Sequence, residues 1–136
     1  MLTLTEIFTI LIVHWIADFV YQDEKWALGK SKNWDDLLKH TITYSVVIMF
    51  SLEFLFLNKF GDSKEDFMDT FIFGSITFIA HTITDYFTSR IVSKRFANKH
   101  YGSAIPNLGA FTIIGIDQVL HYVQLFLTYY YLKGLT

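Results

Sequence analysis

The sequence predicts an all-α fold, a four-transmembrane-helix bundle, formed as a single membrane domain over residues 1–136. Two observations lead to this prediction. Apolar residues make up 52% of the chain and charged residues only 18%, whereas soluble domains have about 25% charged residues. The apolar residues also gather into four segments that approach the roughly 20 residues needed by a membrane-spanning helix. Four such segments in 136 residues leave too little polar surface to cover a soluble globule.

The predicted spans follow one another along the chain with short polar connections between them. They cover residues 2–21, 37–57, 70–89 and 108–132. The first begins with MLTLTEIF, which lacks the basic start of a signal peptide, so we expect this span to be retained. The third contains only His81 and Asp85 as ionisable groups apart from tyrosine, and polar exceptions of the same kind interrupt the fourth.

Basic residues set the expected orientation of the bundle. The first and third connections must lie on the same side of a four-span protein, and with the adjoining helix ends they hold eight of the eleven Lys and Arg residues. The positive-inside rule makes this side cytoplasmic. We therefore expect a multi-pass protein of the inner (cytoplasmic) membrane, with connections one and three in the cytoplasm and both termini outside. The lipid bilayer is then a partner, and association into a homo-oligomer is left open.

Three pairs of His and Asp residues stand four positions apart inside these apolar spans. The pairs are His14 with Asp18, His81 with Asp85, and Asp117 with His121, and a further histidine, His40, opens the second span. Residues i and i+4 share one face of a helix. The fourth span runs opposite to the first and third, and its pair is written in reverse order. All seven side chains are therefore expected at one depth, in the cytoplasmic half of the bundle.

This cluster predicts a metal site. An ionisable group at bilayer depth is costly unless it is paired or hydrated, and imidazole and carboxylate are ligands for Zn²⁺, Mn²⁺ and Fe²⁺. The predicted ligands are His14, Asp18, His81, Asp85, Asp117 and His121. We expect a divalent ion, Zn²⁺ first, with Mn²⁺ or Fe²⁺ as alternatives. Four His and three Asp exceed one tetrahedral shell, so either two ions bind or some carboxylates orient a ligating histidine.

The same residues carry a family resemblance. HWIADFVYQ at 14–22, followed by Trp26 and Lys30, LLKH at 37–40, HTITD at 81–85 and DQVLH at 117–121 are the segments concerned. With them the chain resembles domain-of-unknown-function family 3307, a group of small bacterial and phage membrane proteins. The resemblance implies a small polytopic membrane protein with this polar set, and the family name supplies no activity.

Hydrolysis by a metal-dependent enzyme is the first functional hypothesis, because a bound divalent ion activates water. An aspartate that does not bind the ion, such as Asp18, or else His40 would be the general base, and Gln22 would donate a hydrogen bond to a developing oxyanion. Basic residues at the cytoplasmic mouth would attract an anionic lipid headgroup or nucleotide, although positive-inside sorting alone also explains them. The alternatives are metal or proton transport or sensing, including a metal-free relay, and a non-enzymatic membrane interaction protein with a structural polar network.

Overall fold

The chain folds entirely into helices and connecting turns over the part that the structure describes. The computed structural model describes the backbone of residues 2–60, 63–104 and 106–135 and the side chains of residues 2–51, 67–104 and 106–134. The elements are α1 (Leu4–Trp15), a π-helical turn η1 (Ile16–Val20), α2 (Glu24–Gly29), α3 (Trp34–Phe60), α4 (Ser63–Ala97) and α5 (Ala110–Leu135). No strand occurs among these residues, so the all-α prediction is confirmed.

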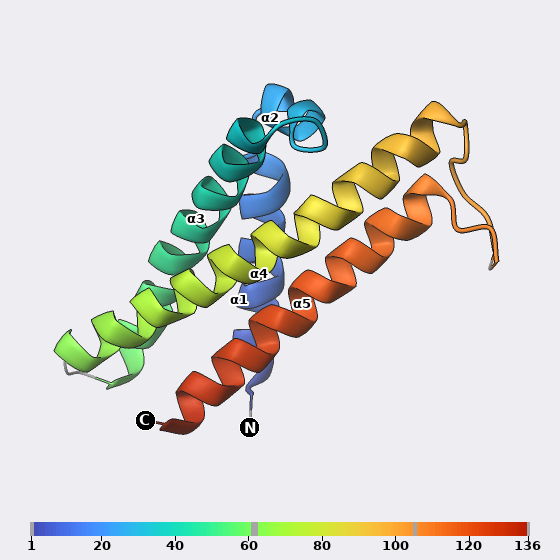
Figure 1. The fold of residues 1–136 in the computed structure, drawn as a ribbon. Helices are drawn as coiled ribbons and strands as arrows, with labels where there is room; N and C mark the ends of the chain where they lie inside the picture. Colours follow the sequence, from blue (N-terminus) through green and yellow to red (C-terminus); the bar gives the residue numbers. More distant parts are fainter. Residues whose placement is uncertain (1, 61–62, 105, 136) are drawn as a thin grey trace.

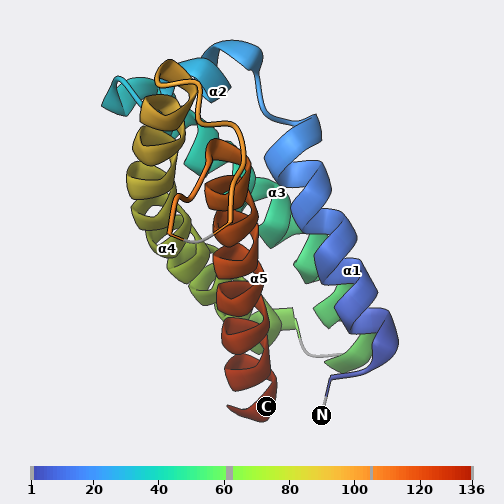
Figure 2. The same ribbon diagram turned by 90° about the vertical axis from the view of Figure 1, so that its right-hand side faces the viewer.

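The four long helices pack into one bundle. Helix α4 lies between α3 and α5, and α1 contacts both α3 and α5. Figure 1 shows both termini at the same end of the bundle, with α2 at the opposite end. The view in Figure 2 shows the same separation and places the connection between α4 and α5 at the α2 end. The first and third connections therefore lie at one end of the molecule.

The predicted spans and the observed helices differ in length. Helix α4 extends beyond predicted span 70–89 at both ends, because the polar residues on either side continue the helix. Two helical stretches, Phe67–Ala97 and Ala110–Gly134, are long and apolar enough to cross a membrane by length and composition. The first two predicted spans do not reach that standard within the described residues, so four membrane spans stay a prediction.

Hydrogen bonds fix the starts of two helices, α1 and α3, that carry residues of the polar cluster. Helix α1 begins with a capping box, in which the Thr3 side chain accepts from the Glu6 backbone and the Glu6 carboxylate accepts from Thr3. Helix α3 begins similarly, because Asn33 and Asp36 exchange hydrogen bonds of 2.8 Å. A side chain at Gly29 would overlap the Asp36 carboxylate. This close approach holds the first connection over the start of α3.

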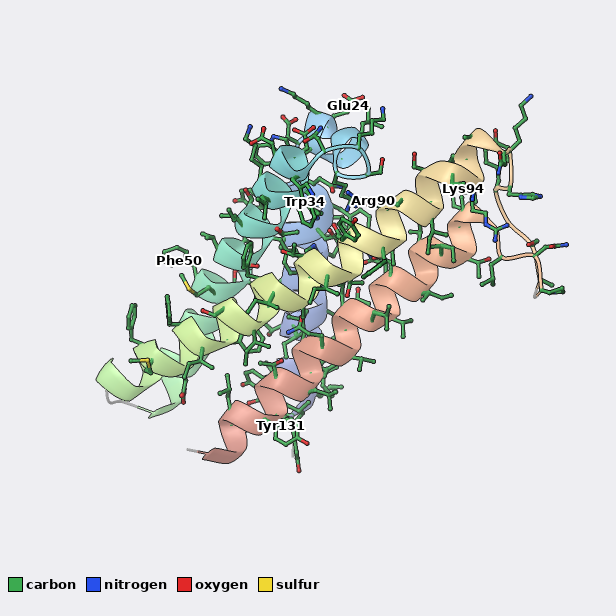
Figure 3. The ribbon with its side chains drawn as sticks, in the orientation of Figure 1. Glu24, Trp34, Phe50, Arg90, Lys94 and Tyr131 are labelled. Carbon is green, nitrogen blue, oxygen red and sulfur yellow. The ribbon has the colours of Figure 1, made fainter. Side chains whose placement is uncertain are left out.

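The interior of the bundle is layered, and its surface is apolar. Ile10, Ile48, Phe73 and Leu125 form a fully buried apolar layer between the polar cluster and the end that carries the termini. Large apolar side chains project outwards from all four helices, and Figure 3 shows Phe50 and Tyr131 pointing away from the bundle. The carboxylate and imidazole side chains of the cluster thus occupy interior positions, while aromatic and aliphatic side chains cover much of the outside of the helices.

Candidate metal centre

His40 is at the centre of the cluster that the sequence predicts. Its Nε2 atom lies 3.1 Å from Nε2 of His81. The same atom lies 3.2 Å from Oδ1 of Asp18 and 3.1 Å from Oδ2 of Asp85. All four residues are buried, with exposed fractions of 4% or less. Turn η1 and helices α3 and α4 thus bring two imidazoles and two carboxylates from three separate segments to one point.

The spacing of these donor atoms is that of ligands around one ion. Two donors bonded at about 2.1 Å to a tetrahedral ion lie about 3.4 Å apart. The contacts of His40 are slightly shorter, and Nε2 of His81 lies 3.9 Å from Oδ1 of Asp18 and 3.7 Å from Oδ2 of Asp85. Oδ1 of Asp18 has no hydrogen-bond partner among the described residues. The residues present therefore fit a divalent ion.

His121 extends the cluster to α5. Its ring lies beside that of His81, with centroids 4.1 Å apart, and its Nε2 lies 3.7 Å from Oδ1 of Asp85. Three overlapping groups have ligand atoms within 4.8 Å of one another: His14, Asp18 and His121; Asp18, His40 and His81; and His81, Asp85 and His121. Six of the seven predicted polar residues thus belong to one connected centre, contributed by α1, η1, α3, α4 and α5.

His14 lies in the cluster, with hydrogen bonds to both ring nitrogens. Nδ1 faces the hydroxyl of Tyr44 at 2.6 Å, and Nε2 donates to Oε1 of Gln118 at 2.8 Å. The same Gln118 amide donates to Oδ2 of Asp18 at 2.9 Å. One amide therefore fixes the relative positions of a histidine and an aspartate. A histidine held in this way is suited to orienting the centre, and it would bind an ion only in place of its contact with Tyr44 or Gln118.

Asp117 lies at the edge of the centre, on the side that faces α2. Its Oδ1 accepts a 2.5 Å hydrogen bond from Thr88, and its Oδ2 lies 3.7 Å from Nδ1 of His121. Asp117 also lines a cavity of about 430 Å³ together with Asp18 and Gln22. Oε1 of Gln22 is buried there without a hydrogen-bond partner in the described part of the chain. The cavity gives the polar cluster an approach from the first connection.

Lys30 reaches into the cluster from the turn after α2. Its Nζ donates to Oδ2 of Asp85 at 2.8 Å and lies 3.5 Å from Nε2 of His40. Burial disfavours the ammonium form, but the nearby Asp85 and Asp18 carboxylates outweigh this effect and raise the pKa of Lys30 above its ordinary value. Lys30 therefore stays positively charged, and it offsets only one of the three carboxylates in the cluster.

Comparison with known proteins places the chain in a family. The model of the family described as "Protein of unknown function (DUF3307)" matches residues 7–136. The chain belongs to DUF3307. The resemblance found in the sequence is therefore confirmed over nearly the whole length of this DUF3307 protein. No curated protein and no solved structure matches it.

Three features of this centre were not predicted from the sequence. The Lys30–Asp85 ion pair joins residues 55 positions apart, and the Gln118–Asp18 hydrogen bond joins residues 100 apart. The π-helical turn that carries Asp18 has no distinctive residue pattern. Of these, only the role of Gln118 could have been inferred from the sequence, because an amide side chain next to Asp117 within an apolar span needs a hydrogen-bond partner inside the bundle.

Proposed function

We propose that this DUF3307 protein is a four-span membrane protein that holds divalent metal near the cytoplasmic face and hydrolyses an anionic lipid or a similar anionic substrate. The observation that carries this proposal is the convergence of donor atoms around Nε2 of His40. His81, Asp18 and Asp85 each place a donor atom within 3.2 Å of it, and Nε2 of His81 lies within 3.9 Å of both carboxylates. Zn²⁺ is the first expectation for the ion, and Mn²⁺ or Fe²⁺ would accept the same donors.

The distribution of apolar side chains supports a membrane location. Only 28% of the most apolar window of Phe67–Ala97 and 22% of that of Ala110–Gly134 is buried inside the bundle. The core helix of a soluble protein would be mostly buried. Trp34, which is 56% exposed, stacks on Tyr86 near the basic end of the molecule, in keeping with an aromatic residue at a membrane interface. Lipid is the environment that suits this apolar exterior.

Charge and burial support an ion in the centre. Asp18, Asp85 and Asp117 bring three carboxylates together, and among the described residues Lys30 is the ammonium group that pairs with them. A divalent cation would balance the remaining negative charge, whereas buried carboxylates without a counter-charge are unfavourable. The ion would supply Lewis acidity, activating water near neutral pH and polarising a carbonyl or phosphoryl oxygen.

The geometry favours a particular division of roles among the predicted residues. His40 has the shortest contacts to the other donors, so we assign it as a ligand with His81, Asp18 and Asp85. Asp117 faces the cavity and is the better general base, because Thr88 holds one carboxylate oxygen while the other accepts only a long hydrogen bond of 3.3 Å from Gln118 and lies toward the cluster. Gln22 stays the proposed donor to the developing oxyanion.

The cavity has the character expected for an amphiphilic, anionic substrate. Lys30 and Lys32 supply positive charge, while Leu28, Val92 and Phe96 form part of an apolar wall. A headgroup could therefore lie beside the cluster with an acyl chain along the apolar side chains. Transport fits the structure less well, because the buried layer of Ile10, Ile48, Phe73 and Leu125 separates the cluster from the end that carries the termini.

Elemental analysis of the purified protein tests the proposal. We expect stoichiometric divalent metal in the wild-type protein and its loss in His81→Ala. We expect Asp117→Asn to keep its metal but to lose the hydrolysis of phosphatidylglycerol in proteoliposomes. Mass spectrometry of the lipid products measures this hydrolysis. His100→Ala, which alters an exposed loop histidine, is the matched control.

Two results would contradict the proposal. Wild-type protein without stoichiometric metal would leave a proton relay or a structural network as the function of the cluster. Metal that is present with no product from phosphatidylglycerol, phosphatidic acid or nucleotide would favour a structural metal site in a membrane interaction protein.

A further inference from the structure

The side chain of His121 is buried without a hydrogen-bond partner. It is 1% exposed, and neither ring nitrogen forms a hydrogen bond to any described residue. The nearest carboxylate oxygens are at 3.7 Å on both sides, one on Asp85 and one on Asp117. A buried imidazole normally has a partner, since an unsatisfied polar group costs free energy. The four-donor site around His40 does not provide this partner.

Asp85 offers its two carboxylate oxygens to different parts of the centre. Oδ2 faces His40 and Lys30 at 3.1 and 2.8 Å. Oδ1 is buried, has no hydrogen-bond partner among the described residues, and faces Nε2 of His121. A carboxylate arranged in this way can bridge two ions, which in two-metal hydrolytic sites lie about 3.5–4 Å apart.

Further ligands lie close to His121. His14 and Asp18 each place a donor atom within 4.8 Å of one on His121 and of one another. The hydrogen bonds of Gln118 to both residues hold them in this position. A second ion between Asp85 and His121 would therefore have a third protein ligand within coordination distance after a small movement.

We propose that the centre binds two divalent ions bridged by Asp85. The first ion takes Asp18, His40, His81 and Oδ2 of Asp85. The second takes Oδ1 of Asp85 and Nε2 of His121, with Asp18 completing its ligands, or His14 once it gives up its contact with Tyr44 or Gln118. This inference rests on the proposed metal-dependent function and extends it. The positive charge of two divalent ions and the Lys30 ammonium group exceeds the negative charge of the carboxylates of Asp18, Asp85 and Asp117. The resulting positive excess beside the cavity favours an anionic substrate.

Manganese titration of the metal-depleted protein tests this proposal without relying on activity. We expect two Mn²⁺ per wild-type chain by isothermal titration calorimetry, and an electron paramagnetic resonance spectrum of two exchange-coupled ions. His121→Ala should bind one Mn²⁺ and show the spectrum of an isolated ion. The exposed-loop variant His100→Ala should match the wild type.

The outcomes separate this inference from the function on which it rests. One uncoupled Mn²⁺ in the wild type, retained in His121→Ala and lost in His40→Ala, would overturn the second site and leave the first. No binding in the wild type would overturn both proposals. If His121→Ala does not fold, the wild-type spectrum still decides, since coupling requires two neighbouring ions.

Discussion

Lys30 is the side chain at which a metal centre and a purely structural network predict different behaviour. Its side chain is 16% exposed, and its ammonium group pairs with the carboxylate of Asp85, whose side chain is 1% exposed. In a structural network, the ion pair between Lys30 and Asp85 is what neutralises the buried carboxylate and stabilises the bundle. In a metal centre, the ammonium only supplements a larger positive charge, and Oδ2 of Asp85 accepts from Lys30 while it also binds the ion. The two cases differ in whether an ion can replace Lys30.

Lys30→Met removes the ammonium group and leaves Asp85 buried without this partner. Removing one partner of a buried pair costs about 3–5 kcal/mol, so we expect a lower melting temperature for the metal-free protein in detergent. Saturating Mn²⁺ should restore most of the loss, because a divalent ion supplies the missing charge. Lys25→Met, at an exposed position in the same connection, is the control. A loss of stability that Mn²⁺ leaves unchanged would favour the structural network.

At the scale of the helices, the predictable features are those that repeat along one segment. The i,i+4 spacing of the His and Asp residues, and its reversal in α5, predicted that these side chains lie together, and six of the seven lie in overlapping groups of donor atoms. Hydropathy reports the apolar length of a segment and not its helical length, so the polar ends of α4 and the short polar α2 were not predicted. The contacts of Lys30 and Gln118 depend on how separate helices pack, which no local pattern records.

Helix α1 is attached to α5 at both of its ends. Near the His/Asp cluster, His14 bonds to Gln118. At the other end, Glu6 is buried, accepts from Lys133 at 2.8 and 2.9 Å, and accepts from Tyr129 at 3.0 Å. The two attachments lie on opposite sides of the apolar layer, so the Glu6 contacts should contribute to stability without contributing to metal binding.

Glu6→Gln tests this separation. The neutral amide cannot accept from Lys133 and Tyr129 as the carboxylate does, and a poorly satisfied buried group costs about 1–3 kcal/mol. We expect a lower melting temperature in detergent with unchanged metal stoichiometry. Asp35→Asn removes an exposed ion pair with Lys39 and should have no measurable effect. Loss of bound metal in Glu6→Gln would show that the two ends of α1 are coupled.

At the scale of the whole molecule, the arrangement of charge agrees with the proposed orientation. The connections that carry most of the Lys and Arg residues lie at the end opposite both termini (Figures 1 and 2). The cavity is near this basic end, since Lys30, Lys32 and Ser93 line it. In the proposed four-span topology, the proposed substrate would enter from the cytoplasm, and the apolar layer would close the opposite side.

The absence of cysteine from the chain allows a direct test of this topology with single introduced thiols. Gly102, Gly115 and Gly134 each have open space where a side chain would begin, and they lie in the third connection, in the predicted fourth span and near the C-terminus. A membrane-impermeant maleimide should label Gly134→Cys in intact bacterial cells and Gly102→Cys only after permeabilisation. Gly115→Cys should resist labelling in both conditions, because maleimide reacts with the thiolate and lipid excludes the water that a thiolate requires. If instead Gly102→Cys were labelled in intact cells and Gly134→Cys only after permeabilisation, the proposed orientation would be reversed. Ready labelling of Gly115→Cys would place this face of α5 in water and contradict the membrane bundle itself.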